Sequence, residues 1–200
     1  MMSGRLPLIG LGTFFVGHER CRLPEALRLS ALMGRLEGFP GSLSIRAARG
    51  FVISSQQSGQ GAFTEDDVVE VEDYDPVRHT CLAIGLREPS ADTPLHWLAY
   101  RTDELTRAVC FAWDIHRREG VGYPAVRHPA GSFEEAMEVV ALAKRSGAPA
   151  GVEGRGYLLR ARSEPELLEL AGHMAAAKEQ GAGGRVQGAG TESPADRGSP

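Results

Sequence analysis

Two pairs of short apolar segments in the first half of the chain constrain its fold more than any other feature. Residues 42–46 and 50–55 form one pair, and residues 68–74 and 80–86 form the other. In the first three segments apolar residues alternate with others, a pattern typical of strands that bury one face. Only a short turn separates the two members of each pair, which predicts two antiparallel hairpins. A largely antiparallel or mixed sheet follows.

Amphipathic helices are predicted on either side of these strands. The expected helices span residues 24–36, 93–104, 131–145 and 163–178, and two further strands are expected at 107–115 and 156–161. Thr93 is the expected N-cap of the second helix, with Pro94 at the first helical position, and Ser132 opens the third. The order of elements predicts an α/β domain in which helices cover a mostly antiparallel or mixed central sheet.

The length of 200 residues is sufficient for one domain, which we place at residues 23–178. Residues 1–22 form an N-terminal extension, which is either a β-hairpin arm, a partner-binding segment or a poorly ordered stretch. Residues 179–200 consist mainly of glycine, alanine, serine, proline and charged residues. Such a composition buries too little apolar surface to offset the entropy of ordering, which predicts a disordered tail.

Charge and cysteine usage exclude several classes of protein. The net charge of -4 gives no attraction for nucleic acid or an anionic membrane. The apolar run at residues 6–16 is too short to span a bilayer, and no small-residue cleavage site follows it. Cys21, Cys81 and Cys110 are scattered and include no CxxC pair, which indicates neither a disulfide framework nor a zinc knuckle. We therefore expect a cytoplasmic protein.

Five segments, in this order, resemble the motif series of the class II aldolase/adducin superfamily. Residues 41–46 (GSLSIR) resemble the family's Gly-Asn-x-Ser-x-Arg, and residues 53–59 resemble its strand ending in Thr-x-Ser-Gly. Residues 89–96 (PSADTPLH) resemble Pro-Ser-Ser-Glu followed by a histidine. Residues 108–113 (AVCFAW) stand where the family has Ala-Val-Val-His-x-His, and residues 154–156 (GRG) where it has Asn-His-Gly. The resemblance covers about residues 24–177 and implies a three-layer α/β/α fold.

The same resemblance implies that a metal site has been lost. In the family a divalent metal, usually zinc, is held by three histidines, whose positions here are Phe111, Trp113 and Arg155. Neither an aromatic hydrocarbon ring nor a guanidinium can ligate zinc, so no cofactor is predicted. In the alternative interpretation a metal has moved to a new set of ligands, or the site works without metal. Asp114 and His116, together with His96 or His128, are the candidate residues for a relocated site.

The position that corresponds to the family's acid/base group keeps a carboxylate, and the phosphate cradle is better preserved than the metal site. Asp92 stands where the family has a catalytic glutamate; it acts either in acid/base chemistry or on the dipole of the following helix. Arg155 is a candidate for stabilising an anion. His96 is expected to be a packed, hydrogen-bonded histidine rather than a catalyst. The predicted phosphate-binding residues are Gly41, Ser42, Ser58, Gly59 and Ser90.

Three functions remain open from the sequence. The first is a non-catalytic relative that binds a phosphorylated metabolite or a protein partner, as the adducin head domain does for proteins. The second is an aldehyde-lyase, an aldolase or epimerase acting on a sugar phosphate. The third is a subunit that pairs with a catalytic homologue. The resemblance also implies a homo-oligomer, in this family a tetramer.

Overall fold

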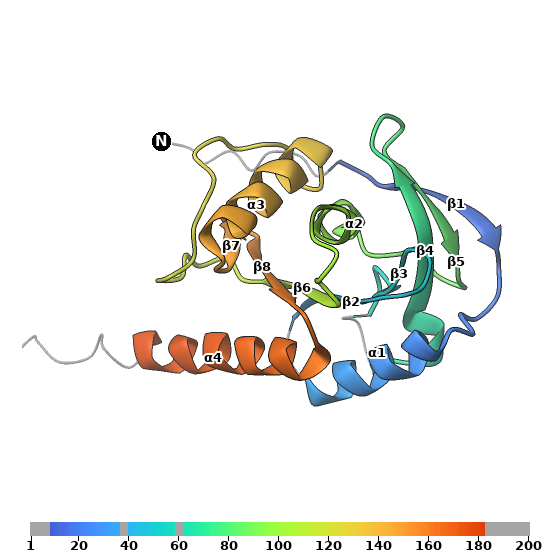
Figure 1. The fold of residues 1–200 in the computed structure, drawn as a ribbon, viewed down its shortest axis with the longest axis horizontal. Helices are drawn as coiled ribbons and strands as arrows, with labels where there is room; N and C mark the ends of the chain where they lie inside the picture. The colour runs from blue at the N-terminus through green and yellow to red at the C-terminus, as the bar shows by residue number, and fades with distance from the viewer. Residues whose placement is uncertain (1–8, 37–39, 59–61, 183–200) are drawn as a thin grey trace, which may run out of the picture.

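The computed structural model describes residues 9–36, 40–58 and 62–182, which fold into three layers (Figure 1). An eight-stranded sheet lies between two pairs of helices. The strands are β1 (Gly12–Gly17), β2 (Gly41–Arg46), β3 (Phe51–Ser54), β4 (Val68–Asp75), β5 (Thr80–Ile84), β6 (Ala108–Trp113), β7 (Ala150–Val152) and β8 (Gly156–Ala161). The helices are α1 (Pro24–Arg35), α2 (Thr93–Thr102), α3 (Phe133–Ser146) and α4 (Glu164–Ala182), with a single 3-10 turn, η1 (Glu65–Asp67), before β4. Within these residues no helix is long and apolar enough to cross a membrane.

The strand order is β1-β5-β4-β3-β2-β6-β8-β7. Every neighbouring pair is antiparallel except β1 and β5, which run parallel. The two hairpins expected from the sequence, β2–β3 and β4–β5, are both present and lie side by side. The predicted α/β fold with a mostly antiparallel sheet is confirmed.

Each face of the sheet buries its own apolar core. On one face Ala26, Leu29 and Leu32 of α1 and Leu167 and Ala171 of α4 cover a cluster of strand side chains. On the other face α2 and α3 pack over a second cluster. Strand β6 lies between β2 and β8 and supplies both cores. Its residues 108, 110 and 112 point to the α1/α4 side, and residues 109 and 111 point to the α2/α3 side.

The described part of the N-terminal extension, residues 9–22, contains one strand and no hairpin. Residues 12–17 form edge strand β1, which pairs in parallel with β5 and leaves Phe14 and Val16 exposed. The two partners are far apart in sequence, since Gly12 lies opposite Thr80. Local pattern could not reveal this pairing because a hairpin signal depends on neighbouring segments. The preceding residues, 1–8, lie outside the described part of the chain.

Several boundaries differ from the sequence prediction. Asp92, and not Thr93, is the N-cap of α2, which places Thr93 at the first helical position and ends the helix at Thr102 instead of residue 104. Strand β7 has only three residues and was not predicted. Helix α4 continues to Ala182, four residues into the expected tail, whose residues 183–200 lie outside the described structure. Ser132 caps α3 as expected, its side chain accepting a hydrogen bond from the Glu135 amide.

Candidate functional site

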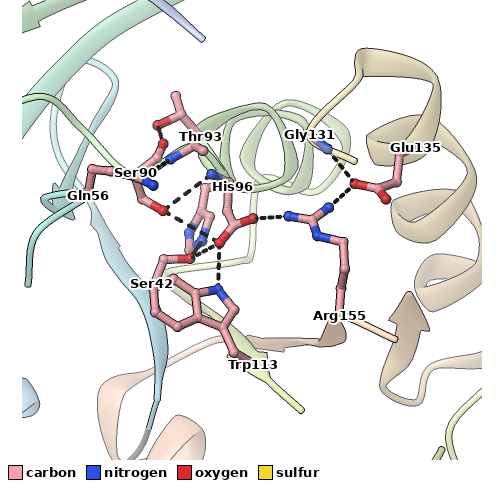
Figure 2. A network of polar contacts seen from close by, with 11 residues as sticks. Ser42, Gln56, Ser90, Thr93, His96, Trp113, Gly131, Glu135 and Arg155 are labelled. Atoms are coloured by element: carbon pink, nitrogen blue, oxygen red, sulfur yellow. Dashed lines mark hydrogen bonds and ion pairs between the residues drawn. The ribbon is translucent and has the colours of Figure 1, made fainter. Parts of the chain in front are cut away.

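Asp92 is the centre of a buried polar network at the N-terminus of α2, and Figure 2 shows other members of this network, among them Ser42, Trp113 and Arg155. Its carboxylate is 3% exposed and accepts hydrogen bonds on both oxygens. Oδ2 accepts from the Ser42 hydroxyl at 3.1 Å and from the Trp113 indole Nε1 at 2.9 Å, with the Ser90 hydroxyl at 3.5 Å. Oδ1 accepts from Arg155 Nη2 at 2.6 Å. Asp92 is the N-cap by backbone position, but its side chain makes no capping hydrogen bond.

Arg155 bridges Asp92 to a second buried carboxylate. Its Nη1 forms an ion pair with Glu135 Oε2 in the first turn of α3, while its Nη2 pairs with Asp92. The arginine is presented by the tight turn between β7 and β8, where Gly154 adopts a positive φ of 75°. Figure 2 shows the Arg155 guanidinium directed at the Glu135 carboxylate, and its other terminal nitrogen pairs with Asp92. The Asp92, Glu135 and Arg155 side chains are only 3%, 5% and 21% exposed, so this is a nearly enclosed ionic triad.

The sheet supplies the aromatic side of this site. Phe111 and Trp113 alternate with Ala112 on β6, so both face α2. Phe111 is fully buried, and its ring centroid is 5.3 Å from Cζ of Arg155. The indole of Trp113 reaches Asp92, although the residue is 37% exposed. The three positions that the resemblance equates with metal ligands therefore lie together, and two of them contact the carboxylate at the acid position.

A second hydrogen-bonded chain runs from this carboxylate into the core through His96. Its Nε2 is 2.9 Å from Ser42 Oγ, and its Nδ1 is 2.7 Å from Ser44 Oγ, which is 2.8 Å from the Tyr100 hydroxyl. A carboxylate can only accept, so Ser42 donates to Asp92 and accepts from His96 Nε2–H. Nδ1 then accepts from Ser44, and Ser44 accepts from Tyr100. His96 is thus the packed, hydrogen-bonded histidine that the sequence predicted.

Burial controls the ionisation of these groups. Burial lowers the pKa of His96 to about 3, so the ring is neutral near pH 7. Burial also raises the pKa of Glu135 above its ordinary value, although Arg155 and the Gly131 amide oppose that shift. The pKa of Tyr100 is raised by burial as well. The site thus holds neutral hydrogen-bonding groups around one ionic triad.

The predicted phosphate-binding residues are partly brought together. The segment after β3 pairs with the segment before α2, because Ser55 forms a bridge with Pro89 and the Gln56 side chain accepts from the Ala91 amide at 2.7 Å. Ser58 ends the first segment and is buried, and Ser90 lies in the second and is also buried. Gly59 lies outside the described residues.

Strand β2 supplies the other two predicted phosphate-binding residues, Gly41 and Ser42. Both already have a role within the protein. Ser42 directs its hydroxyl to Asp92 and His96. A Cβ on Gly41 would lie 2.4 Å from the Phe111 carbonyl oxygen. Gly41 therefore allows close packing of β2 against β6.

The residues considered for a relocated metal site do not converge. Asp114 forms an ion pair with Arg118 at 2.5 Å and accepts from the His116 amide, so its carboxylate is engaged locally. His128 is 4.0 Å from Glu138 on α3, and His96 is enclosed by serines. Within the described residues, no group of three or more His, Cys, Asp or Glu side chains is arranged to hold a metal ion.

Sequence reasoning missed Glu135 as a site residue. The sequence indicated only an acidic residue in the first turn of a helix. The structure buries it, with Oε2 accepting from the Gly131 amide at 2.9 Å and pairing with Arg155. Its position three residues after Ser132 was a capping-box signal, but nothing in that spacing places α3 beside the turn that carries Arg155.

Comparisons with known proteins agree with this fold. Residues 21–121, half of the chain, match the family described as Class II Aldolase and Adducin N-terminal domain. The fold is similar to that of an L-fuculose 1-phosphate aldolase (TM-score 0.62, 15% identity, covering 84% of this chain and 91% of that one). It is also similar to an L-fuculose-1-phosphate aldolase from Thermus thermophilus (TM-score 0.54, 21% identity, 80% and 97% covered).

A third similar structure is YgbL from Klebsiella pneumoniae, described as a putative aldolase/epimerase/decarboxylase (TM-score 0.59, 14% identity, 82% and 91% covered). A search of curated protein sequences finds no significant match. At these identities the structural likeness shows the fold alone, while the family match spans the segments that carry Ser42, Asp92, Phe111 and Trp113. The chain belongs to the class II aldolase/adducin family.

Proposed function

We propose that this chain is a non-catalytic member of the family, in which an ionic triad of Asp92, Arg155 and Glu135 replaces the catalytic metal centre. One observation carries the proposal: the Arg155 guanidinium lies between the two carboxylates, in contact with the ring of Phe111. A fixed positive charge at this place balances buried carboxylates that a divalent cation would otherwise balance.

The donor set does not fit a metal. Zinc requires thiolate, imidazole or carboxylate ligands in a compact arrangement. Phe111 offers no lone pair, the Trp113 nitrogen donates its hydrogen to Asp92, and Arg155 repels a cation. The carboxylates that remain are both engaged by Arg155.

The acid position is also unsuited to proton transfer. A general acid or base needs an oxygen within hydrogen-bond reach of the substrate. Asp92 is 3% exposed, and its oxygens already accept from Arg155, Trp113 and Ser42. Both Nη atoms of Arg155 are paired with carboxylates, which argues against its predicted role as an anion stabiliser for a substrate. These contacts support a structural role for the residues at the former centre.

The function that then remains is binding, and a phosphorylated metabolite is the ligand that the family context favours. Two of the similar structures are named as aldolases of L-fuculose 1-phosphate. The adjoining segments 55–58 and 88–91 carry Ser58 and Ser90, two of the predicted phosphate-binding residues. Calorimetric titration with a panel of sugar phosphates tests this part of the proposal, and no heat of binding for any of them would remove it.

Activity and metal content test the non-catalytic part. We expect the wild-type chain to show no cleavage of L-fuculose 1-phosphate with added Zn²⁺ and no stoichiometric metal by elemental analysis. The matched variant is Phe111→His/Trp113→His/Arg155→His, which restores imidazole at all three positions. We expect that variant to bind one divalent ion. A wild-type chain that retains one equivalent of metal, and loses it on His116→Ala, would support the lyase alternative instead.

Assembly remains a separate proposal. We propose self-association of the kind the family resemblance implies, or pairing with a catalytic homologue. Light scattering of the purified chain, alone and with such a homologue, distinguishes the two. A monomer at every concentration and in every mixture would contradict both.

A further inference from the structure

The carboxylate of Asp67 ties together three segments that are separate in the sequence. Asp67 ends η1, and its side chain is only 2% exposed. Its Oδ1 accepts a hydrogen bond from the Ser55 hydroxyl at 2.8 Å and forms an ion pair with Arg87 Nη1. Its Oδ2 accepts from the amide and from the hydroxyl of Thr64, both at 2.9 Å. We call this group of four residues the Asp67 clamp: Ser55, Thr64, Asp67 and Arg87.

The local turn accounts for only one of the two carboxylate oxygens. Thr64 is the N-cap of η1, and its contacts with Oδ2 are those of a capping box. The partners of Oδ1 are distant, since Ser55 lies 12 positions before Asp67 and Arg87 lies 20 positions after it. Oδ1 therefore makes contacts that the turn does not require.

The Asp67 clamp keeps a buried carboxylate ionised. Burial by itself would raise the pKa of Asp67, but hydrogen bonds from Thr64, Ser55 and Arg87 outweigh burial and lower that pKa below its ordinary value. The carboxylate is therefore charged near pH 7 and pairs with a guanidinium. The Arg87 side chain is 36% exposed, so the ion pair lies at the edge of the buried region.

The Asp67 clamp also holds one end of each of the two segments that carry predicted phosphate-binding serines. Ser55 begins segment 55–58, and its amide donates to the Asp67 carbonyl at 2.7 Å. Arg87 directly precedes segment 88–91 in the chain. One carboxylate thus connects the beginnings of both segments.

Further hydrogen bonds join the two segments to each other. The Gln56 amide donates to the Glu88 carbonyl at 2.9 Å, and the Ala91 amide donates to the Gln56 side chain at 2.7 Å. The Ser58 amide donates to the Ser55 carbonyl at 3.2 Å, which closes the turn of the first segment. A single bond of this kind contributes little to stability, so the relative position of the segments depends on what anchors their ends.

We propose that Asp67, through its ion pair with Arg87, is a positioning residue that holds these two segments in the arrangement required to bind a phosphorylated ligand. This inference rests on the proposed function, because it takes Ser58 and Ser90 as ligand contacts. Segments that are ordered before binding lose less entropy when the ligand arrives, which increases affinity. Asp67 is buried, so it acts through Ser55 and Arg87 and does not touch the ligand.

Calorimetric titration of the full chain with L-fuculose 1-phosphate and with inorganic phosphate measures the effect on affinity. We expect Arg87→Met to weaken binding about tenfold, and Arg87→Lys to recover part of that loss because lysine keeps the positive charge. Asp66→Asn is the matched control, because Asp66 is the adjacent carboxylate and pairs with Arg20 at 2.7 Å on the surface. That variant should bind as the wild type does, and equal weakening by it would overturn the proposal.

Amide hydrogen exchange tests the positioning without any ligand. The amides that donate within the two segments, or between them and their neighbours, are those of Gln56, Ser58, Ser90 and Ala91. We expect Arg87→Met and Asp67→Asn to increase their exchange rates about tenfold more than those of the amides in central strand β6. Rates that do not change, or that rise by the same factor in β6, would overturn the proposal.

The two measurements separate this inference from the proposed function. If the wild type binds neither probe while the exchange rates respond as expected, the proposed ligand is wrong and the positioning role of Asp67 is supported. If the wild type binds a probe and Arg87→Met binds it equally well, the positioning role is wrong and the proposed ligand class stands. Among the described residues Asp67 shares no hydrogen-bond partner with Asp92, so neither result depends on the ionic triad.

Discussion

Replacing Arg155 by methionine isolates the energetic role of the ionic triad. Methionine keeps much of the length and apolar surface of the arginine stem but removes the guanidinium. Asp92 and Glu135, only 3% and 5% exposed at their side chains, would then face each other without their shared partner. Asp92 retains its bonds from Ser42 and Trp113, and Glu135 retains its bond from Gly131.

The size of the loss follows from burial. Removing one partner of a buried ion pair costs about 3–5 kcal/mol, because it leaves an uncompensated charge. Arg155 is one-fifth exposed, so solvent already weakens its pairing and we expect a loss near the lower limit, about 3 kcal/mol. For a chain of this size each kcal/mol changes the Tm by about 2–4 °C, which predicts a decrease of about 6–12 °C.

The loss should depend on pH in a defined direction. Glu135 has a folded-state pKa raised above its ordinary value, so its folded form binds a proton more tightly than the unfolded chain does. Stability from this group is present at low pH and declines as pH rises from about 4.5 through the raised folded-state pKa. Arg155 opposes the rise of the Glu135 pKa, so replacing Arg155 raises the pKa of Glu135 further. The deficit of Arg155→Met should therefore be largest at pH 7 and smaller at pH 5.

Urea denaturation followed by circular dichroism at both pH values measures this deficit. Arg117→Met is the control, because Arg117 is 62% exposed and lies 3.7 Å from Glu153, so no measurable change is expected. If Arg155→Met loses less than about 1 kcal/mol, or loses as much at pH 5 as at pH 7, the triad does not stabilise the fold as reasoned.

Three further predictions concern the surroundings of the site and the core. Ser132→Ala should cost about 1 kcal/mol in urea denaturation, because it removes the cap that accepts from the Glu135 amide; an unchanged midpoint would contradict that role. Gly50→Ala should cost about 2 kcal/mol or more, since Gly50 has φ 61° and its Cβ would lie 1.9 Å from the Val71 carbonyl oxygen; a calorimetric Tm equal to that of the wild type would be inconsistent. His96, with a pKa of about 3, should show a constant NMR shift for its Cε1 proton between about pH 8 and 5. Because the folded state resists protonation of this ring, the wild type should lose stability as pH falls from 6.5 toward 3. A titration midpoint near 6.5 would rule out the burial of His96.

The sequence contained most of the local structure but little of the assembly. The β2–β3 and β4–β5 hairpins, the Ser132 cap and the central β6 were predictable, because each depends on residues within a short window. The parallel partner of β1 was not predictable, since nothing near residue 12 specifies residue 80. Strand β7 was missed because three residues are too few for a period to be recognised.

The candidate site was likewise predictable only in part: its residues could be named from the sequence, but their contacts could not. Motif order placed Asp92, Phe111, Trp113 and Arg155 as candidates, and the structure brings all four together. Their pairing could not be derived, because an ion pair between residues 63 positions apart depends on how α2 and the β7–β8 turn meet across the sheet. Glu135 was therefore missed although its local signal was visible.

The parallel pairing of β1 with β5 also affects how the chain is made. Sixty-eight residues separate the register partners Thr13 and Cys81. At about 5–20 residues per second, a ribosome needs roughly 3–14 s to make that stretch. During this interval the Gly-Thr-Phe-Phe-Val-Gly segment has no partner strand, and Phe14 and Val16 stay exposed even after it docks. We therefore expect the nascent β1 segment to be prone to aggregation until β5 has been made, because it is an apolar strand without a partner.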